Sequence, residues 1–291
     1  MKPIKVAALQ MTCTSDKTCN IETAEKLVRK AASQGARIIL LQELFETLYF
    51  CQEEKAEHFK LATELEKNQA VLSLSKLAKE LNVVLPVSFF EKTNQARYNS
   101  IAVIDADGSI LGLYRKTHIP DGPGYEEKFY FNPGDTGFKV WKTRFATIGI
   151  GICWDQWFPE AARCMALMGA EILFYPTAIG SEPADPLYDS KDHWQACICG
   201  HSAANLMPVV TSNRVGTETF GTSQITFYGS SFITDNKGRI LAQADRKNEA
   251  ILVVEIDLDA YAQNREAWGL FRDRRPEKYG PLMTLDGKTM P

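Results

Sequence analysis

Residues 149–155 read GIGICWD, and the prediction of the fold starts from this stretch. The apolar, β-branched run of Thr147, Ile148 and Ile150 predicts a buried strand that leads into Cys153. The pattern that follows predicts a helix at 159–168. A cysteine between a buried strand and a helix start is well placed as a nucleophile, because free N–H groups and the helix dipole favour a thiolate. It can equally be a small buried hydrophobic side chain, so both interpretations stay open here.

The composition is that of an ordinary globular chain, since 45% of the 291 residues are hydrophobic and 24% are charged. A net charge of -3 gives no electrostatic reason to expect nucleic acid or an anionic membrane as a partner. The sequence has neither a secretion-signal pattern nor an apolar run of membrane-spanning length. The odd number of cysteines, seven, favours a reduced, cytoplasmic protein over a disulfide framework.

The order of the expected elements predicts an α/β fold. Strands are expected at 4–10, 36–43, 83–90, 98–104, 109–115, 138–152, 171–178, 207–213, 225–234, 238–245 and 249–256, and helices at 20–34 (capped by Asn20), within 52–82, and at 159–168, 193–205 and 257–267. The segments 33–43 and 167–177 repeat one pattern of helix end, Gly-Ala turn and buried strand, which predicts two βαβ-like halves in one continuous sheet system. Without a break in composition, we expect one domain over 1–271 and a tail over 272–291.

Three polar side chains follow apolar strand patterns at equivalent places: Glu43, Lys116 and Cys153. In α/β sheets the carboxyl ends of the strands are where loops converge into an active site. A carboxylate there can take the thiol proton, the thiolate can attack a carbonyl or nitrile carbon, and an ammonium can stabilise the oxyanion. Each residue alone is weak evidence, because a charge at a strand end is usually solvated, but their joint placement predicts a nucleophilic site.

The segments that carry these residues resemble the three signature segments of the nitrilase superfamily of carbon–nitrogen hydrolases. They are LLQELF (40–45), YRKTHIP (114–120) and GICWDQWFPE (151–160). The resemblance implies a four-layer αββα sandwich of two mixed sheets covered by helices, and a Glu–Lys–Cys triad on Glu43, Lys116 and Cys153. It also implies a second glutamate in the following loop, which Glu127 matches best although Glu126 is adjacent. It implies no metal or organic cofactor, and a homo-oligomer in which we expect 272–291 to pack on a neighbouring subunit.

The loops 118–138 and 175–183 resemble those of the branch that hydrolyses N-carbamoylputrescine. Independently of that resemblance, acidic loop residues beside aromatic ones suit an alkyl chain that ends in an ammonium, whereas a substrate carboxylate would require an arginine. Arg214 is an arginine outside these loops that could reach the site. The side chains expected to bind the substrate are Tyr49, His118, Asp121, Tyr130, Trp154 and Glu182, with Phe129, Trp194 and Asp185 as further candidates near the slot. The backbone N–H of Trp154 is expected to assist Lys116 at the oxyanion.

Three alternatives remain at this point. The first is another amidase of the same superfamily, such as a β-ureidopropionase, an ω-amidase or a nitrilase. The second is a binding or scaffold protein that keeps the fold without the chemistry. The third is a zinc protein, whose ligands would be Cys197, Cys199, His193 and His201, although a second ligand pair at zinc-finger spacing is missing.

Overall fold

The computed structural model describes residues 3–288. The strands are β1 (Ile4–Gln10), β2 (Ile38–Leu40), β3 (Leu85–Thr93), β4 (Ala96–Ile104), β5 (Ile110–Arg115), β6 (Val140–Lys142), β7 (Thr147–Ile150), β8 (Ile172–Pro176), β9 (Val209–Ser212), β10 (Val215–Phe220), β11 (Ser223–Tyr228), β12 (Phe232–Thr234), β13 (Ile240–Gln243) and β14 (Ala250–Ile256). The α-helices are α1 (Lys17–Ser33), α2 (Gln69–Leu81), α3 (Glu127–Tyr130), α4 (Pro159–Leu167), α5 (Lys191–Asn205) and α6 (Leu258–Trp268). Short 3₁₀ turns are η1 (Phe50–Gln52), η2 (Ala56–Leu61), η3 (Leu65–Lys67), η4 (Cys153–Trp157), η5 (Pro276–Lys278) and η6 (Gly280–Met283).

The strands form two layers. In the first layer the order β14-β1-β2 continues into β3-β4-β5 through a parallel bridge between Ile38 and Val84. In the second layer the order is β13-β12-β9-β8-β7-β6. Each layer contains a parallel pair built as strand, helix, strand: β1-α1-β2 in the first and β7-α4-β8 in the second. The two βαβ-like units expected from the repeated segments are therefore present, but they lie in two separate sheets and not in one continuous sheet system. Both layers mix parallel and antiparallel pairs.

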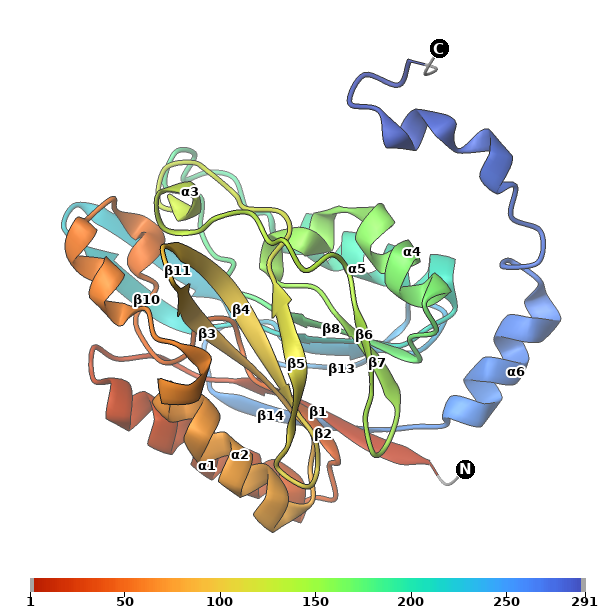
Figure 1. The fold of residues 1–291 in the computed structure, drawn as a ribbon, viewed down its shortest axis with the longest axis horizontal. Helices are drawn as coiled ribbons and strands as arrows, with labels where there is room; N and C mark the ends of the chain where they lie inside the picture. Colours follow the sequence, from red (N-terminus) through yellow and green to blue (C-terminus); the bar gives the residue numbers. More distant parts are fainter. Residues whose placement is uncertain (1–2, 289–291) are drawn as a thin grey trace.

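Three apolar clusters hold the layers together. Between the sheets, Val6, Leu40 and Ile101 of the first sheet share a cluster with Ile148 and Phe174 of the second. A second cluster joins α1 and α2 to the outer face of the first sheet, and a third joins α4 and α5 to the outer face of the second. Figure 1 shows the two helix pairs on opposite sides of the strands. This is the predicted αββα sandwich, because each sheet buries one face against the other sheet and one against helices.

The glycine at the start of the decisive stretch is required by close packing of α4 on β7. A Cβ built on Gly149 would lie 2.8 Å from a Leu173 methyl and 3.0 Å from Met165, which are too close for real carbon atoms. Gly149 therefore lets β7 lie directly beneath α4 and beside β8. This close approach fixes where the chain leaves the sheet at Cys153.

Three local features were not predicted correctly. Helix α1 begins at Lys17 and is capped by Asp16, whose carboxylate accepts the N–H groups of Thr18 and Cys19; Asn20 is instead buried inside the first turn. The region expected as one strand over 225–234 is two strands, because Gly229 and Ser230 both have a φ of 54° and break the extended run. The hairpin β10–β11 was missed.

The helix expected at 159–168 is confirmed as α4, which begins at Pro159. The 3₁₀ turn η4 lies between Cys153 and this helix, so Cys153 is not at the start of the α-helix. Helix α6 and the chain after it extend away from the sandwich in Figure 1. Residues 1–2 of the expected domain and 289–291 of the expected tail lie outside the described residues.

Candidate active site

The four side chains predicted to carry the chemistry lie together at one edge of the sandwich. Glu43 follows β2, Lys116 directly follows β5, and both strands belong to the first sheet. Cys153 follows β7 of the second sheet, and Glu127 is the first residue of α3 in the loop after Lys116. The inter-sheet cluster includes Cys153, so the site lies where the two sheets face each other.

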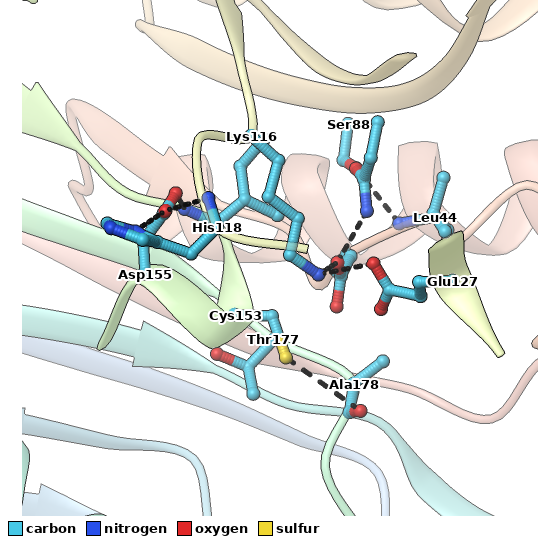
Figure 2. Close-up of polar contacts among 12 residues, drawn as sticks. Leu44, Ser88, Lys116, His118, Glu127, Cys153, Asp155, Thr177 and Ala178 are labelled. Carbon is cyan, nitrogen blue, oxygen red and sulfur yellow. Dashed lines mark hydrogen bonds and ion pairs between the residues drawn. The ribbon is translucent and has the colours of Figure 1, made fainter. Parts of the chain in front are cut away.

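Lys116 is the centre of a buried ion cluster. Its ammonium donates to Glu43 Oε1 at 2.9 Å and to Glu127 Oε2 at 2.6 Å, and all three side chains are at most 1% exposed. Figure 2 shows the ammonium pointing toward Glu127. Burial alone would lower the pKa of Lys116, but the charges of Glu127 and Glu43 outweigh it and raise that pKa well above its ordinary value. Lys116 is therefore a permanent cation here.

Glu127, rather than its neighbour Glu126, faces Lys116. Its second oxygen, Oε1, accepts a hydrogen bond of 2.8 Å from the Tyr49 hydroxyl, so both oxygens are engaged. Burial raises the pKa of Glu127 to about 7, against the opposing effect of Lys116. Glu126 is only partly buried, and its backbone N–H donates to the carbonyl of Cys51.

The two oxygens of Glu43 have different surroundings. Oε1 accepts from Lys116 and from the Asn99 amide, the latter at 2.6 Å. Oε2 is buried and accepts no hydrogen bond from the described residues. A carboxylate oxygen without a donor is the more basic one, because no hydrogen bond stabilises its charge. Oε2 is thus the atom of Glu43 best suited to take a proton.

Cys153 is a neutral thiol in the resting site. The side chain is only 6% exposed, and burial, reinforced by Glu43, raises the pKa of the thiol well above its ordinary value despite Lys116. Its φ of 42° lies in the left-handed region, which is strained for a residue with a Cβ and is common at functional sites. Figure 2 shows the sulfur pointing toward Ala178, whose carbonyl oxygen is 3.9 Å away. The thiol therefore needs a base, and the helix dipole does not supply the thiolate.

Asp155 connects the Cys153 turn with the chain after Lys116. This fully buried carboxylate accepts from the backbone N–H groups of Ile152 and His118 at 2.9 and 3.0 Å and from the Tyr114 hydroxyl at 2.7 Å. The ring Nδ1 of His118 lies 2.7 Å from the same carboxylate (Figure 2). Asp155 thereby holds two loops from different sheets at a set distance from each other.

A cavity of about 160 Å³ opens beside Cys153. Its wall consists of Pro120, Asp121, Gly122, Pro123, Tyr125, Glu127, Cys153, Trp154, Gln156, Trp157, Ala178, Ile179, Glu182 and Ala184. The structure thus brings three of the predicted substrate-binding residues, Asp121, Trp154 and Glu182, to the cavity. The Glu182 carboxylate accepts a hydrogen bond of 2.9 Å from Ser190, and burial raises its pKa.

The structure does not place Tyr49, His118 and Tyr130 in the cavity wall. Tyr49 is fully buried and donates to Glu127. The His118 ring stacks on Phe158 with centroids 3.6 Å apart, held there by Asp155. The Tyr130 hydroxyl accepts from the Lys55 N–H at 2.9 Å, on the far side of α3.

The further candidates near the slot also lie outside the cavity wall. Trp194 is buried and donates to Gln156, Phe129 stacks on Phe59, and Asp185 is an exposed loop residue. Arg214 is buried beneath the turn at Glu43 and Leu44 and does not reach the cavity.

Sequence reasoning missed several residues of the wall. Tyr125 precedes the GYEE glutamates by one position, and its hydroxyl accepts from the Gly180 N–H at 3.0 Å. Gln156 and Trp157 belong to the CWDQW segment that was already quoted for Cys153. All three residues lie within the sequence segments around Glu127 and Cys153, which could have indicated that they are near the site. Position in such a segment does not show whether a side chain points into the cavity.

The zinc hypothesis finds no support in the geometry. His201 faces the Gln156 carbonyl at 2.6 Å, whereas the His193 ring lies against Trp157. Between residues 3 and 288, His, Cys, Asp and Glu side chains form no group of three or more that could hold a metal ion. None of the helices in the same range has both the length and the apolar character needed to cross a membrane.

Comparisons with known proteins agree with the geometry. The family model described as carbon-nitrogen hydrolase matches residues 5–266. The chain is 59% identical over 290 residues to an N-carbamoylputrescine amidase of Arabidopsis thaliana, covering 98% of this chain and 97% of that protein. It is 54% identical to a citrullinase of Francisella tularensis, covering 97% and 99%. The crystal structure of a carbon-nitrogen hydrolase from Helicobacter pylori superposes with a TM-score of 0.92 at 41% identity, covering 98% and 99%.

Proposed function

The chain belongs to the carbon–nitrogen hydrolase family, the nitrilase superfamily, and we propose that it hydrolyses N-carbamoylputrescine to putrescine, carbon dioxide and ammonia. The observation that carries this choice of substrate is the charge of the cavity wall. Asp121 and Glu182 contribute carboxylates, and no lysine or arginine of the described residues contributes to the wall. The third carboxylate of the wall, Glu127, is already paired with Lys116. A cavity with a nucleophile and two further carboxylates suits a carbamoyl group that is joined by an alkyl chain to an ammonium.

The reaction begins with proton transfer from Cys153 to Glu43, whose Oε2 is free to accept it. The thiolate adds to the ureido carbon, and the Lys116 ammonium holds the oxyanion that develops. The Trp154 N–H is a second oxyanion donor, because the first N–H groups of a 3₁₀ turn have no partner within the turn. The departing nitrogen takes the proton from Glu43, which leaves the carbamoyl group on Cys153 as a thiocarbamate that keeps the second nitrogen.

The second half of the reaction releases the acyl group. Glu43 takes a proton from water, the resulting hydroxide attacks the thiocarbamate carbon, and the departing Cys153 thiolate takes the proton back from Glu43. The carbamate that forms, or its N-alkyl form if ammonia departs first, breaks down to carbon dioxide and an amine or ammonia. Glu127 stays paired with Lys116 throughout and keeps the ammonium aimed at the oxyanion. The assembled cluster also disfavours the scaffold alternative, for which a buried lysine between two carboxylates would have no use.

Citrulline hydrolysis is the second candidate, because a citrullinase is among the relatives at 54% identity. Citrulline carries a carboxylate beside its amino group, and a β-ureidopropionase substrate ends in a carboxylate alone. Either carboxylate would meet Asp121 or Glu182 without a cation to pair with, so the cavity favours the diamine derivative. The ω-amidase and nitrilase alternatives share the catalytic cluster and differ only in this wall.

The deciding experiment compares kcat/KM for N-carbamoylputrescine, citrulline, N-carbamoyl-β-alanine and uncharged N-carbamoylbutylamine. We expect N-carbamoylputrescine to exceed the uncharged analogue by at least about tenfold, which is one charge contact of ordinary strength. Glu182→Gln should remove most of that preference while leaving kcat/KM for N-carbamoylbutylamine nearly unchanged. The exposed Asp185 serves as the matched control, since Asp185→Asn should change neither rate. A preference for citrulline or for the β-alanine derivative would overturn the proposal.

We also propose that the protein assembles into a homo-oligomer through α6 and the tail. Helix α6 buries only Leu258, and the chain after it leaves large apolar side chains in solvent. These are Trp268, Leu270, Leu282, Met283 and Leu285, of which Leu282 is 62% and Met283 is 80% exposed. Apolar side chains presented by a segment that stands away from the sandwich are best explained by a second copy that covers them. A cytoplasmic location is part of the same proposal, since all seven cysteines are unpaired.

A further inference from the structure

A second buried ion pair lies behind the catalytic cluster and belongs to no step of the reaction. Arg214, between β9 and β10, is 0% exposed, and Glu218 on β10 is 4% exposed. The Arg214 guanidinium donates to Glu218 Oε1 at 2.9 Å. Neither residue contributes to the cavity wall, so neither can touch a substrate. A buried arginine with its partner costs desolvation energy, which raises the question of what the pair holds in place.

Arg214 holds the turn that carries Glu43. Its Nη2 atom donates to the carbonyl oxygens of Glu43 and Leu44 at 3.2 and 2.5 Å, and its Nη1 atom donates to that of Thr47 at 2.9 Å. Leu44 has a φ of 48°, a left-handed conformation that an L-residue adopts only when its surroundings compensate for the strain. Three carbonyl oxygens that converge on one guanidinium provide this compensation, because the rigid fork of arginine satisfies several acceptors at once.

Glu218 is connected to Glu127, the second carboxylate of the catalytic cluster, through Tyr49. Its Oε2 atom accepts the backbone N–H of Tyr49 at 2.5 Å, and the Tyr49 hydroxyl donates to Glu127 Oε1 at 2.8 Å. Lys116 then joins Glu127 to Glu43, at 2.6 and 2.9 Å. The contacts form a closed ring that runs from Arg214 through Glu43, Lys116, Glu127, Tyr49 and Glu218 back to Arg214.

We infer that the Arg214–Glu218 pair is a positioning device that sets where the Glu43 and Glu127 carboxylates stand relative to Lys116. The inference rests on the catalytic roles proposed above for Glu43 and Glu127. The pair fixes Glu43 through its own backbone and fixes Glu127 through Tyr49. A small displacement of Glu43 changes the distance over which it takes the proton of Cys153, and a small displacement of Glu127 moves the Lys116 ammonium relative to the oxyanion. Such displacements lower the rate even when the substrate still binds.

The test uses Glu218→Gln and Tyr49→Phe, each in the full chain. Glu218→Gln keeps the shape of the side chain but loses the charge that pairs with Arg214. It also replaces one of the two acceptor oxygens by an NH₂ group, so the side chain can no longer accept from both Arg214 and the Tyr49 N–H. Tyr49→Phe leaves the ion pair whole and removes only the hydroxyl that holds Glu127, so it remains informative if Glu218→Gln fails to fold. The matched control is Glu91→Gln, which removes a buried Arg–Glu pair with Arg115 at 2.6 Å. Arg115 directly precedes Lys116 in the chain, but neither Glu91 nor the Arg115 side chain hydrogen-bonds to a side chain of the ring.

We expect both variants to lower kcat at least about tenfold with KM within about twofold, because the cavity wall is intact. The loss in the double variant should be smaller than the product of the two single losses, since both act on Glu127 through Tyr49. Glu91→Gln should lower the melting temperature but not kcat. A folded Glu218→Gln variant with wild-type kcat, or an equal loss of kcat in Glu91→Gln, would overturn the inference.

A second readout is independent of the substrate. The rate at which iodoacetamide alkylates Cys153, followed by mass spectrometry of the peptide that contains it, reports how well Glu43 deprotonates the thiol. Glu218→Gln should slow this alkylation, and Glu91→Gln should not. If the wild type hydrolyses none of the carbamoyl amines but these alkylation rates behave as expected, the proposed substrate fails while the positioning role stands. An unchanged alkylation rate in Glu218→Gln contradicts the positioning role, whatever the substrate is.

Discussion

The Lys116 ammonium donates to Glu127 over 2.6 Å, and neither side chain is more than 1% exposed. The contact makes Glu127 the partner that holds the cation, while Glu43, at 2.9 Å, keeps one oxygen free. Glu43 and Glu127, the two carboxylates around Lys116, thus have different environments and different roles. Glu127 orients the positive charge, and Glu43 exchanges protons with Cys153 and water.

The first prediction concerns pH and Glu127. Burial raises the pKa of this carboxyl from 4.5 to about 7, so the group stabilises the fold fully below pH 4.5 and this contribution is lost as the pH rises through about 7. The free energy of unfolding of wild type minus that of Glu127→Gln should therefore fall by roughly 3 kcal/mol across this window. Urea titrations at several pH values measure the difference, and a difference that rises with pH would contradict the assigned direction.

Activity should rise, whereas stability falls, as the carboxyl of Glu127 ionises. Both oxygens of Glu127 accept hydrogen bonds, one from Tyr49 and one from Lys116, which is the arrangement of the ionised form. We expect kcat/KM to rise as the pH passes through about 7. The groups that face Glu127 and set this value are Lys116, Glu43 and Tyr49. A rate independent of pH across that range would show that the protonated form serves equally well.

The second prediction concerns the nucleophile. Cys153→Ser should fold with a melting temperature close to wild type but lose activity by at least about a thousandfold, because the hydroxyl is a far weaker nucleophile with this base. Cys164 is exposed on α4, so Cys164→Ser is the matched control and should retain full activity. Mass spectrometry during turnover should detect an adduct on Cys153 in the wild type alone. Appreciable activity in folded Cys153→Ser would refute the role of Cys153.

The third prediction concerns Asp155, which accepts from four donors on two loops. Asp155→Asn replaces one acceptor oxygen by an NH₂ group that faces donors, and should cost roughly 2–4 kcal/mol of stability together with most of the activity. Tyr114→Phe removes a single donor and should cost about 1 kcal/mol. Thermal unfolding and kcat together measure the effect, and an Asp155→Asn variant no less stable than Tyr114→Phe would contradict the connecting role.

The fourth prediction concerns the proposed assembly. Deleting 272–291 removes the exposed Leu282, Met283 and Leu285, and should reduce the mass of the particle measured by light scattering. Leu282→Asp with Met283→Asp should have the same effect without shortening the chain. Leu187 is 97% exposed in the loop before α5, so Leu187→Asp is the control and should not change the mass. A wild type that is already monomeric would rule the assembly out.

Much of the fold was predictable because strand and helix patterns are local. The run 36–43 and its counterpart 171–178 became β2 and β8, which occupy matching parallel positions in the two sheets. Local pattern failed where local signals compete. Asn20 and Asp16 both have side chains that can cap a helix. In the structure Asp16 caps α1, whereas the buried Asn20 side chain donates to the carbonyl oxygens of Thr14 and Glu46. The stretch 225–234 reads as one extended run, yet Gly229 and Ser230 take left-handed conformations that end β11.

The sequence by itself determined the chemistry of the site: a thiol, an ammonium and a carboxylate, each just after an apolar strand. Strand ends can be located from the chain alone, because burial of a strand requires an apolar run and its end is where that run stops. Only the tertiary structure decided the direction in which the remaining side chains point. Tyr49 and Tyr130 are aromatic and near the site, as a substrate slot requires. Tyr49 instead holds Glu127, and Tyr130, the last residue of α3, accepts from the Lys55 N–H. Arg214 and Glu218 could not be connected with Glu43 and Glu127 from sequence, since contacts across 171 and 169 residues arise only when the two sheets pack face to face.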